Sequence, residues 1–262
     1  MSQFFRNFPK VPYKFGDETD YNLMDNLAKY SDFFVNVKDQ VSFMQYYTVL
    51  DGDRPDTLSY KLYGSPDYHW TFYLLNEHLR ESGWPLSEHE IEVQLAKNFP
   101  YIAITSNCKD QGGDKLNSDV DDDNIGAIFL VGTEVTGRET SHDAVIVERN
   151  IDIGQFILQP LTSADTFIGD SFLRYNPGDG EQTLQIIEVN DQKDAVHHYE
   201  DSDGVWQDIN PFEITTRTPV GLTTVTLEDN FRNKNDELKQ IKVLRREVVK
   251  TITSEYFKSI KR

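Results

Sequence analysis

The residues of this chain that could take part in catalysis or ligand binding include histidines and glycines that stand in fragments of known motifs. His89-Glu90-Ile91-Glu92-Val93 begins like a zinc-protease helix, but Val93 stands where that motif needs its second histidine. The segment from Gly178 to Thr183 begins like a dinucleotide-binding loop and lacks the third glycine. A hairpin turn is the better interpretation of that segment, so neither motif predicts catalysis.

Two other groups have side chains that bind metals. Asp119, Asp121 and Asp123 have the alternate spacing of a calcium loop, but Asn124 stands at its glycine position and Leu130 at its closing glutamate position. This pattern favours a solvated acidic loop.

His197 and His198 are adjacent, so on a strand they would point to opposite faces, and no cysteine or third histidine follows nearby. The sequence therefore predicts no metal, no cofactor and no enzyme. A glycoside hydrolase that uses a pair of carboxylates stays open as an alternative, because an acidic chain always offers such pairs.

Composition narrows the class of protein. A chain of 262 residues with 38% hydrophobic content can bury a substantial core in one or two domains. Cys108 is the only cysteine, so no intrachain disulfide is expected, and a reducing cytoplasm fits as the place of synthesis. The sequence has no stretch of about 20 apolar residues and begins without the apolar core of a secretory signal, so we expect neither membrane insertion nor export.

The formal net charge of −18 argues against nonspecific binding to nucleic acid or to an anionic membrane. The charged residues are unevenly distributed along the sequence. Residues 101–210 hold 22 of the 44 acidic side chains and only 6 basic ones, whereas residues 232–262 hold 10 basic and 4 acidic ones. The basic tail is either a docking surface for an acidic partner or a solvated face, and both alternatives stay open.

The helices and strands that the sequence predicts indicate an α+β fold, and they divide the chain into four regions. The first, 1–45, begins with an extended arm rich in aromatic residues and proline, followed by a short helix from Tyr21 to Lys29 that contains Leu23 and Met24. Exposed aromatic side chains at this density are unusual in a free monomer, so we expect the arm to bind another chain, with packing on its own core as the alternative.

The second region, 46–100, predicts a strand at Tyr46 to Leu50, a helix capped by Asp56 or Thr57 that stops at Gly64, and a second helix from Pro66 to Asn76. The order "D-T-L-S-x-x-L-Y-G", a tryptophan and then "L-L-N" resembles the LysM module, a small βααβ domain best known for binding N-acetylglucosamine polymers. Ser87 and Glu90 form a capping box that predicts a further helix, ending before Pro100.

The third region, 101–210, predicts a small β-barrel or sandwich inserted into the chain. Turns are expected at 132–137 and 176–180, and an exposed loop at 109–124. The predicted strands are Tyr101 to Thr105, Ala127 to Val131, Ala144 to Glu148, Phe156 to Leu158 and Leu184 to Val189.

The fourth region, 211–262, predicts an extended strap at Ile241 to Leu244 and a final helix with Val249, Ile252, Tyr256 and Ile260 along one side.

The opening "F-F-R-N-F-P-K-V-P-Y", the LysM-like block closed by Trp84-Pro85-Leu86-Ser87, and the tail "N-D-E-L-K-Q-I-K-V-L-R-R-E" resemble the baseplate wedge subunit of contractile-tailed bacteriophages. The resemblance covers both ends and the LysM-like block. It implies a non-enzymatic virion protein, made in the host cytoplasm, that joins other wedge proteins and clamps neighbouring wedges into a sixfold ring of several copies.

We expect partner binding through apolar terminal residues, with basic side chains setting the register. The alternative is a cell-wall glycan-binding protein or murein hydrolase accessory that uses the LysM-like block. The predicted partner-binding residues are Phe4, Phe5, Phe8, Tyr13, Phe15, Ile241, Val243, Arg245, Arg246, Ile252, Tyr256 and Ile260.

Overall fold

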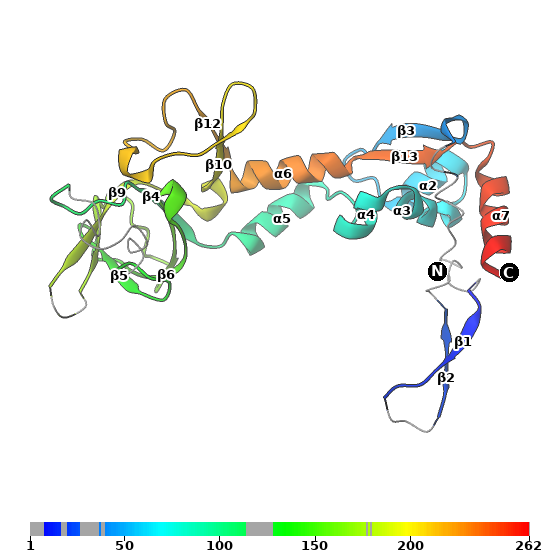
Figure 1. Cartoon of the computed structure of the whole chain (residues 1–262), viewed down its shortest axis with the longest axis horizontal. Helices are drawn as coiled ribbons and strands as arrows, with labels where there is room; N and C mark the ends of the chain where they lie inside the picture. The colour runs from blue at the N-terminus through cyan, green and yellow to red at the C-terminus, as the bar shows by residue number, and fades with distance from the viewer. Residues whose placement is uncertain are drawn as a thin grey trace. The chain divides into compact units, whose positions relative to one another are not determined.

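The computed structural model describes residues 8–16, 20–26, 37, 40–113, 128–176, 178 and 180–261. Within these ranges the chain has six α-helices and 13 strands, which confirms the α+β class. It divides into two compact units (Figure 1): unit 1 contains residues 1–90 and 234–262, and unit 2 contains residues 91–233. Unit 1 is therefore built from both ends of the chain.

Unit 1 contains a two-stranded antiparallel sheet whose strands come from distant parts of the sequence. Its strands are β3 (Met44–Thr48) and β13 (Gln240–Leu244), in a register that places Tyr46 opposite Lys242. The helical elements of unit 1 are η2 (Val41–Phe43), α2 (Pro55–Tyr63), η3 (Pro66–Tyr68), α3 (Trp70–Leu75), α4 (Glu77–Ser82) and α7 (Val249–Lys261). Local order along the first part is thus strand, helix, helix, with the second strand supplied from the other end of the chain.

Helix α2 starts slightly earlier than its capping residues predict. The N-cap is Arg54, and Pro55 occupies the first helical position, where its missing N–H is not needed. Thr57 still serves the cap, because its Oγ1 accepts a hydrogen bond from the Arg54 N–H at 3.0 Å. Gly64 ends the helix in the left-handed conformation, with φ of 76°, as predicted.

The second predicted helix begins with one turn of 3₁₀ helix, η3, before α3. Its end is fixed by Asn76, whose side chain reaches the sheet. Asn76 Nδ2 donates to the carbonyls of Phe72 and Lys242, and Asn76 Oδ1 accepts from the Lys242 N–H, each at 2.8 Å. A single buried amide therefore joins the end of α3 to β13.

The core of unit 1 is apolar and includes one face of α7. Trp70 stacks on Tyr256 with ring centroids 5.3 Å apart and lies against Phe257 at 5.2 Å. The buried residues of this core come from the helices, from both strands and from Phe8 near the start of the chain. Burying a large apolar side chain completely stabilises a fold by roughly 1.5 to 3 kcal/mol, so this cluster accounts for the docking of α7.

Helices α5 (Glu88–Asn98) and α6 (Leu227–Leu238) both begin with reciprocal caps. At α5, the Ser87 N–H donates to Glu90 Oε2 at 2.9 Å and the Glu90 N–H donates to Ser87 Oγ at 3.4 Å, which confirms the predicted capping box. At α6, Thr226 and Asp229 make the equivalent pair of bonds, each at 3.0 Å.

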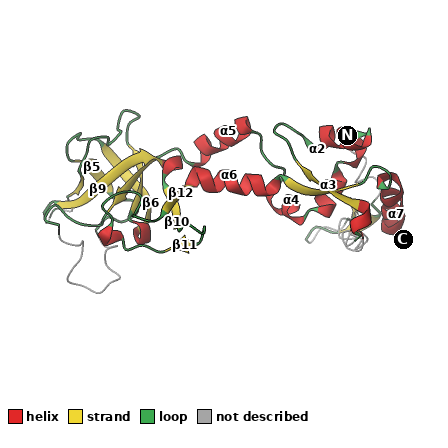
Figure 2. Ribbon diagram, turned by 90° about the horizontal axis from the view of Figure 1, so that it is seen from above, coloured by secondary structure: helices red, strands yellow, loops and turns green. Residues whose placement is uncertain are grey.

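Six antiparallel strands of unit 2 close into a barrel in the order β4-β7-β6-β5-β8-β9, with β9 pairing back to β4 (Figure 2). Closure leaves no free strand edge in the barrel, and its centre is apolar. The strands are β4 (Ile102–Ser106), β5 (Glu134–Gly137), β6 (Asp143–Asn150), β7 (Gln155–Pro160), β8 (Phe172–Tyr175) and β9 (Gln182–Asp191).

The strands of this region differ from the predictions in two places. Residues 128–131 form a turn in place of the predicted strand at Ala127 to Val131, because Phe129 alone is buried while the next two residues are exposed. Conversely, residues 134–137 form β5 where a turn was predicted, and Val135 faces the barrel core. Of the predicted loop at 109–124, residues 109–113 are described and contain a turn, and the remainder lies outside the described residues.

Beside the barrel, unit 2 has a small sheet in the order β11-β10-β12, formed by β10 (Val196–Glu200), β11 (Trp206–Gln207) and β12 (Thr223–Thr226). Short 3₁₀ turns occur at Ile151–Ile153, Gln192–Asp194 and Pro211–Glu213.

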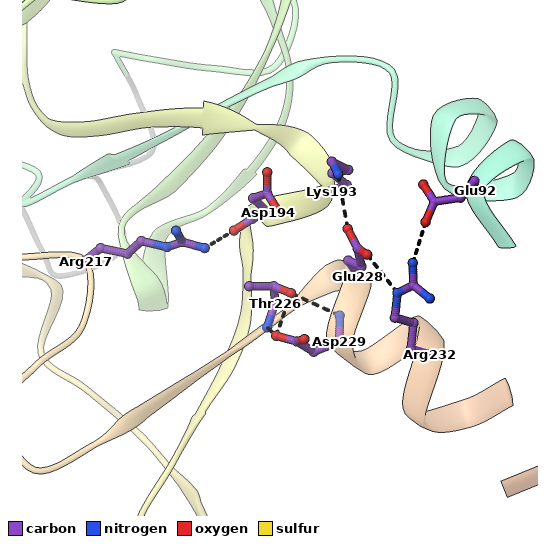
Figure 3. A network of polar contacts seen from close by, with 8 residues as sticks. All are labelled: Glu92, Lys193, Asp194, Arg217, Thr226, Glu228, Asp229 and Arg232. Carbon is purple, nitrogen blue, oxygen red and sulfur yellow. Dashed lines mark hydrogen bonds and ion pairs between the residues drawn. The ribbon is translucent and has the colours of Figure 1, made fainter. Parts of the chain in front are cut away.

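A chain of ion pairs connects this sheet region to α6 and α5 (Figure 3). Glu228 accepts from Arg232 Nε at 2.7 Å and from Lys193 Nζ at 3.3 Å, and Arg232 Nη2 also pairs with Glu92 at 2.5 Å. The hydrogen bond from Arg232 lowers the pKa of the Glu228 carboxyl group. Arg217 donates to the backbone carbonyl of Asp194 in the same region. These contacts fix the first turns of α6 within unit 2.

Candidate interaction surface

A group of exposed apolar residues of unit 1 lies on and next to a β-hairpin near the start of the chain. Its strands are β1 (Lys10–Tyr13) and β2 (Asn22–Asp25), drawn in blue in Figure 1. The strand β2 replaces the predicted helix over 22–25, residues 21 and 26 have no regular secondary structure, and residues 27–29 of that prediction lie outside the described residues. Spacing of apolar residues alone misled the prediction here, because the pairing with β1 decides the backbone conformation.

The hydrogen-bonding pattern of the hairpin follows from one bond. The Asn26 N–H donates to the Pro9 carbonyl at 2.8 Å, so this pair is a hydrogen-bonded one. Paired and unpaired positions alternate along an antiparallel ladder, and the observed register therefore makes Pro12 opposite Leu23 a non-hydrogen-bonded pair. Pro12 therefore costs the hairpin no hydrogen bond, because its nitrogen, which carries no hydrogen, faces the outer edge.

The two outer edges of the hairpin are consequently unlike. On β1, Pro12 presents a carbonyl without an N–H, which blocks regular strand addition. On β2, Leu23 and Asp25 direct complete N–H and C=O groups outward. In the part of the chain that the structure describes, no strand pairs with that edge. The hairpin therefore has one closed and one open edge.

Both faces of the hairpin carry exposed apolar side chains. Tyr13 and Met24 share one face, because Met24 lies directly opposite Val11 and Tyr13 is two residues from Val11 on β1. Leu23, which lies opposite Pro12, is on the other face. Phe15 extends the first face by an edge-to-face contact with Tyr13, at 5.0 Å between centroids. The exposed fractions are Tyr13 52%, Phe15 48%, Tyr21 69%, Leu23 73% and Met24 42%.

The predicted partner-binding residues of the amino-terminal arm separate into three groups. Tyr13 and Phe15 are on this exposed surface, whereas Phe8 is buried in the core of unit 1. Phe4 and Phe5 lie outside the described residues. The hairpin residues Tyr21, Leu23 and Met24 were missed as surface residues, although proline at 9 and 12 and glycine at 16 are signals of turns and edge strands.

The tail residues require a correction. The apolar ones are at most 5% exposed and pack in the chain's own core, so their side chains are not available to a partner in this structure. An amphipathic stripe indicates that a face is covered without saying by what, and here the covering surface is internal. These buried residues are Ile241, Val243, Ile252, Tyr256 and Ile260. Arg245 and Arg246 are exposed, and Arg245 Nε donates to the Met44 carbonyl at 3.1 Å.

A separate cleft of about 460 Å³ lies between residues 52–55 and 84–87, with Glu90 at its side. Its tryptophan, Trp84, packs its ring against Phe72 at 5.9 Å and donates its indole N–H to the Asp53 carbonyl at 2.7 Å. The indole is therefore already engaged in the fold.

The described residues contain no group of three or more His, Cys, Asp or Glu placed to hold a metal ion. None of the helices within the described ranges combines the length and apolarity that crossing a bilayer requires. No family model matches the chain, and a search of curated proteins finds no match either.

Proposed function

We propose that this chain is a non-enzymatic structural subunit of a bacteriophage tail baseplate wedge, which uses its amino-terminal hairpin to hold neighbouring proteins. In this proposal unit 1 is a LysM-like scaffold, with β3, α2, α3 and β13 as its βααβ order. Unit 2 is an insertion between the helices and the last strand. The position of the whole of unit 2 between β3 and β13 in the sequence supports that arrangement.

The observation that carries the proposal is the two-faced hairpin. A two-stranded hairpin is marginally stable by itself, and exposed apolar residues on both of its faces add an unfavourable contact with water. Tyr13, Phe15, Leu23 and Met24 would be buried if the hairpin lay between two protein surfaces. A clamp between subunits needs such a two-sided contact.

The open edge of β2 suggests how one of those contacts forms. An extended strand of a neighbouring subunit would add to Leu23 and Asp25 through backbone hydrogen bonds, a common mode of peptide recognition. Addition to the other edge is disfavoured by Pro12. Lys10 and Asp25 form an ion pair at 2.6 Å across the hairpin, which leaves no uncompensated charge on that pair of residues.

The glycan-binding alternative has less support. Trp70, the tryptophan of the LysM-like pattern, is only 7% exposed and lies against α7. The aromatic residue that lines the cleft at Asp53 is Trp84, whose ring already packs against Phe72 and whose indole N–H is already hydrogen-bonded. A peptidoglycan pull-down separates the alternatives, since retention that depends on residues 52–58 would favour a lectin.

Wedge assembly from purified components tests the proposal directly. Leu23→Ser with Met24→Ser should abolish incorporation while leaving the thermal unfolding of the free chain nearly unchanged, because both side chains are exposed. Tyr60→Ser, which removes a 66% exposed side chain from α2, is the matched control and should assemble normally. Normal assembly of the double variant would show that the hairpin is not part of the interface, and it would refute the proposal.

A further inference from the structure

Nearly all of the net charge of this protein is carried by unit 2. Unit 2 has 26 acidic and 9 basic side chains, for a net charge of −17, whereas unit 1 has 18 and 17. Between Lys193 and Arg217 there are six Asp or Glu residues and no Lys or Arg. This stretch includes β10, β11 and the loop that connects them.

An exposed tryptophan is held in a fixed orientation in the same stretch. Trp206, on β11, is 64% exposed. Its indole stacks on the His198 imidazole with centroids 4.0 Å apart and planes 25° apart, and the His197 ring meets it edge-on at 5.6 Å. One face of the indole is therefore supported, and the opposite face is open to solvent.

The supporting histidine is itself fixed. His198 is 9% exposed, and its Nε2 lies 2.9 Å from Glu200 Oε1. Its other ring nitrogen, Nδ1, shares a hydrogen bond with Nδ1 of His197 at 2.8 Å. Both nitrogens of the imidazole beneath Trp206 are thus engaged, so rotation of the platform would break two hydrogen bonds.

The loop before Trp206 is also ordered by hydrogen bonds. The Asp201 carboxylate accepts from the N–H groups of Asp203 and Val205 at 2.9 and 3.0 Å, and from Gln207 Nε2 at 2.7 Å. In contrast, the exposed carboxylates of Asp203 and Asp208 contact no hydrogen-bond donor or cation among the described residues. Two exposed negative charges therefore stand on either side of Trp206 in the sequence, three residues before it and two residues after it.

We propose that Trp206 and the carboxylates of Asp203 and Asp208 form a docking site for a basic segment of a partner protein. An Arg or Lys side chain lies over the open face of the indole, and neighbouring cations pair with the two aspartates. Tryptophan is the best aromatic acceptor for such a cation, and the acidic field of unit 2 steers the basic segment toward it. Phosphate-bearing partners are disfavoured by the same field.

The net negative charge of unit 2 would by itself attract any basic peptide. The test must therefore distinguish binding at Trp206 from this general electrostatic attraction. The probe is a fluorescein-labelled arginine-rich peptide, and its Kd for the full-length chain is measured by anisotropy at physiological salt. Trp206→Ala should weaken binding about five- to thirty-fold, the range expected for loss of a cation–π contact. Trp206→Phe should retain most of the affinity, because an aromatic face remains.

Matched charge variants provide the second arm. Asp203→Asn with Asp208→Asn removes two exposed charges at the site, and Glu134→Gln with Glu148→Gln removes two exposed charges from barrel strands. The first pair should weaken binding several-fold more than the second. Equal effects of the two pairs, or unchanged binding by Trp206→Ala, would overturn the proposal and leave only a nonspecific acidic surface.

Folding of each variant is checked by its thermal transition, which should stay close to that of the parent because every replaced side chain is exposed. The assay uses the purified chain alone, so its outcome is independent of wedge assembly.

Discussion

Replacing Asn235 should show how much one buried amide contributes to unit 1. Asn235 is on α6 and is only 4% exposed. Its Oδ1 accepts from the Leu86 N–H at 2.7 Å, and its Nδ2 donates to the Leu86 carbonyl at 3.1 Å. The side chain thus satisfies both backbone groups of a residue in the connection between α4 and α5. Sequence reasoning gave no indication of this contact.

The magnitude follows from two opposing terms. Each lost hydrogen bond lowers the free energy of unfolding by about 1 kcal/mol, and somewhat more where a backbone group is left without a partner. Alanine is a better helix former than asparagine by roughly 0.5 kcal/mol, which offsets part of the loss. Asn235→Ala should therefore destabilise unit 1 by about 1 to 2 kcal/mol.

Asn233 provides the matched control, because it lies two residues earlier on the same helix and is exposed. Asn233→Ala gains the same helix propensity without losing the contact to Leu86, so it should raise the free energy of unfolding slightly. The difference between the two variants, about 2 kcal/mol, isolates the pair of hydrogen bonds. Equal shifts in the two variants would refute the assignment of stability to the Asn235 amide.

Urea unfolding of unit 1 can be followed by tryptophan fluorescence. Trp70 and Trp84 both belong to unit 1, whereas Trp206 belongs to unit 2, so a Trp206→Phe background restricts the signal to unit 1. This separation matters because a chain with two units need not unfold in a single two-state transition.

Two predictions concern unit 2. Gly154 has a φ of +62°, and a Cβ there would overlap the Ser106 carbonyl, whereas Gly132 has a φ of +90° and open space around it. Gly132→Ala should therefore cost about 1 to 2 kcal/mol for the left-handed backbone, and Gly154→Ala about 1 to 3 kcal/mol more, by urea unfolding; equal costs would contradict the clash. Burial raises the pKa of the Cys108 thiol from 9.0 to about 11. Thiol labelling at pH 8 should consequently be at least about a hundredfold slower than in urea, and stability should fall as the pH rises from 9 toward 11, because the unfolded thiol loses its proton first; equally fast labelling of the folded chain would contradict a buried thiol.

Elements governed by nearest neighbours were predictable from the sequence. The capping box of Ser87 and Glu90 and the stop at Gly64 act within one helical turn, and both occur where expected. The start of α2 was missed by a small margin because proline at the first helical position transferred the cap to Arg54. Local signals therefore predicted where helices occur better than where they begin.

Elements that depend on distant partners were not predictable. The segments 46–50 and 241–244 were both expected to be extended, yet nothing in either one indicates that β3 pairs with β13 across most of the chain. The helix predicted over residues 21–29 is wrong in its described part, 21–26, for the same reason, since Leu23 and Met24 fit helical spacing until β1 provides a strand partner. Pairing energy decided these segments, and sequence patterns do not report it.

Exposure was the hardest property to predict, and it changes which surface is proposed to bind partners. The apolar stripe of α7 and the aromatic arm were both predicted to bind partners, but Tyr256 is buried while Tyr13 and Leu23 are exposed. Since α7 already has a covering surface, replacing its stripe would unfold unit 1 before it affected any interface. The hairpin is different, because its apolar faces and the open edge of β2 add little to the core of unit 1. A variant of the hairpin can therefore separate assembly from folding, which a variant of α7 cannot do.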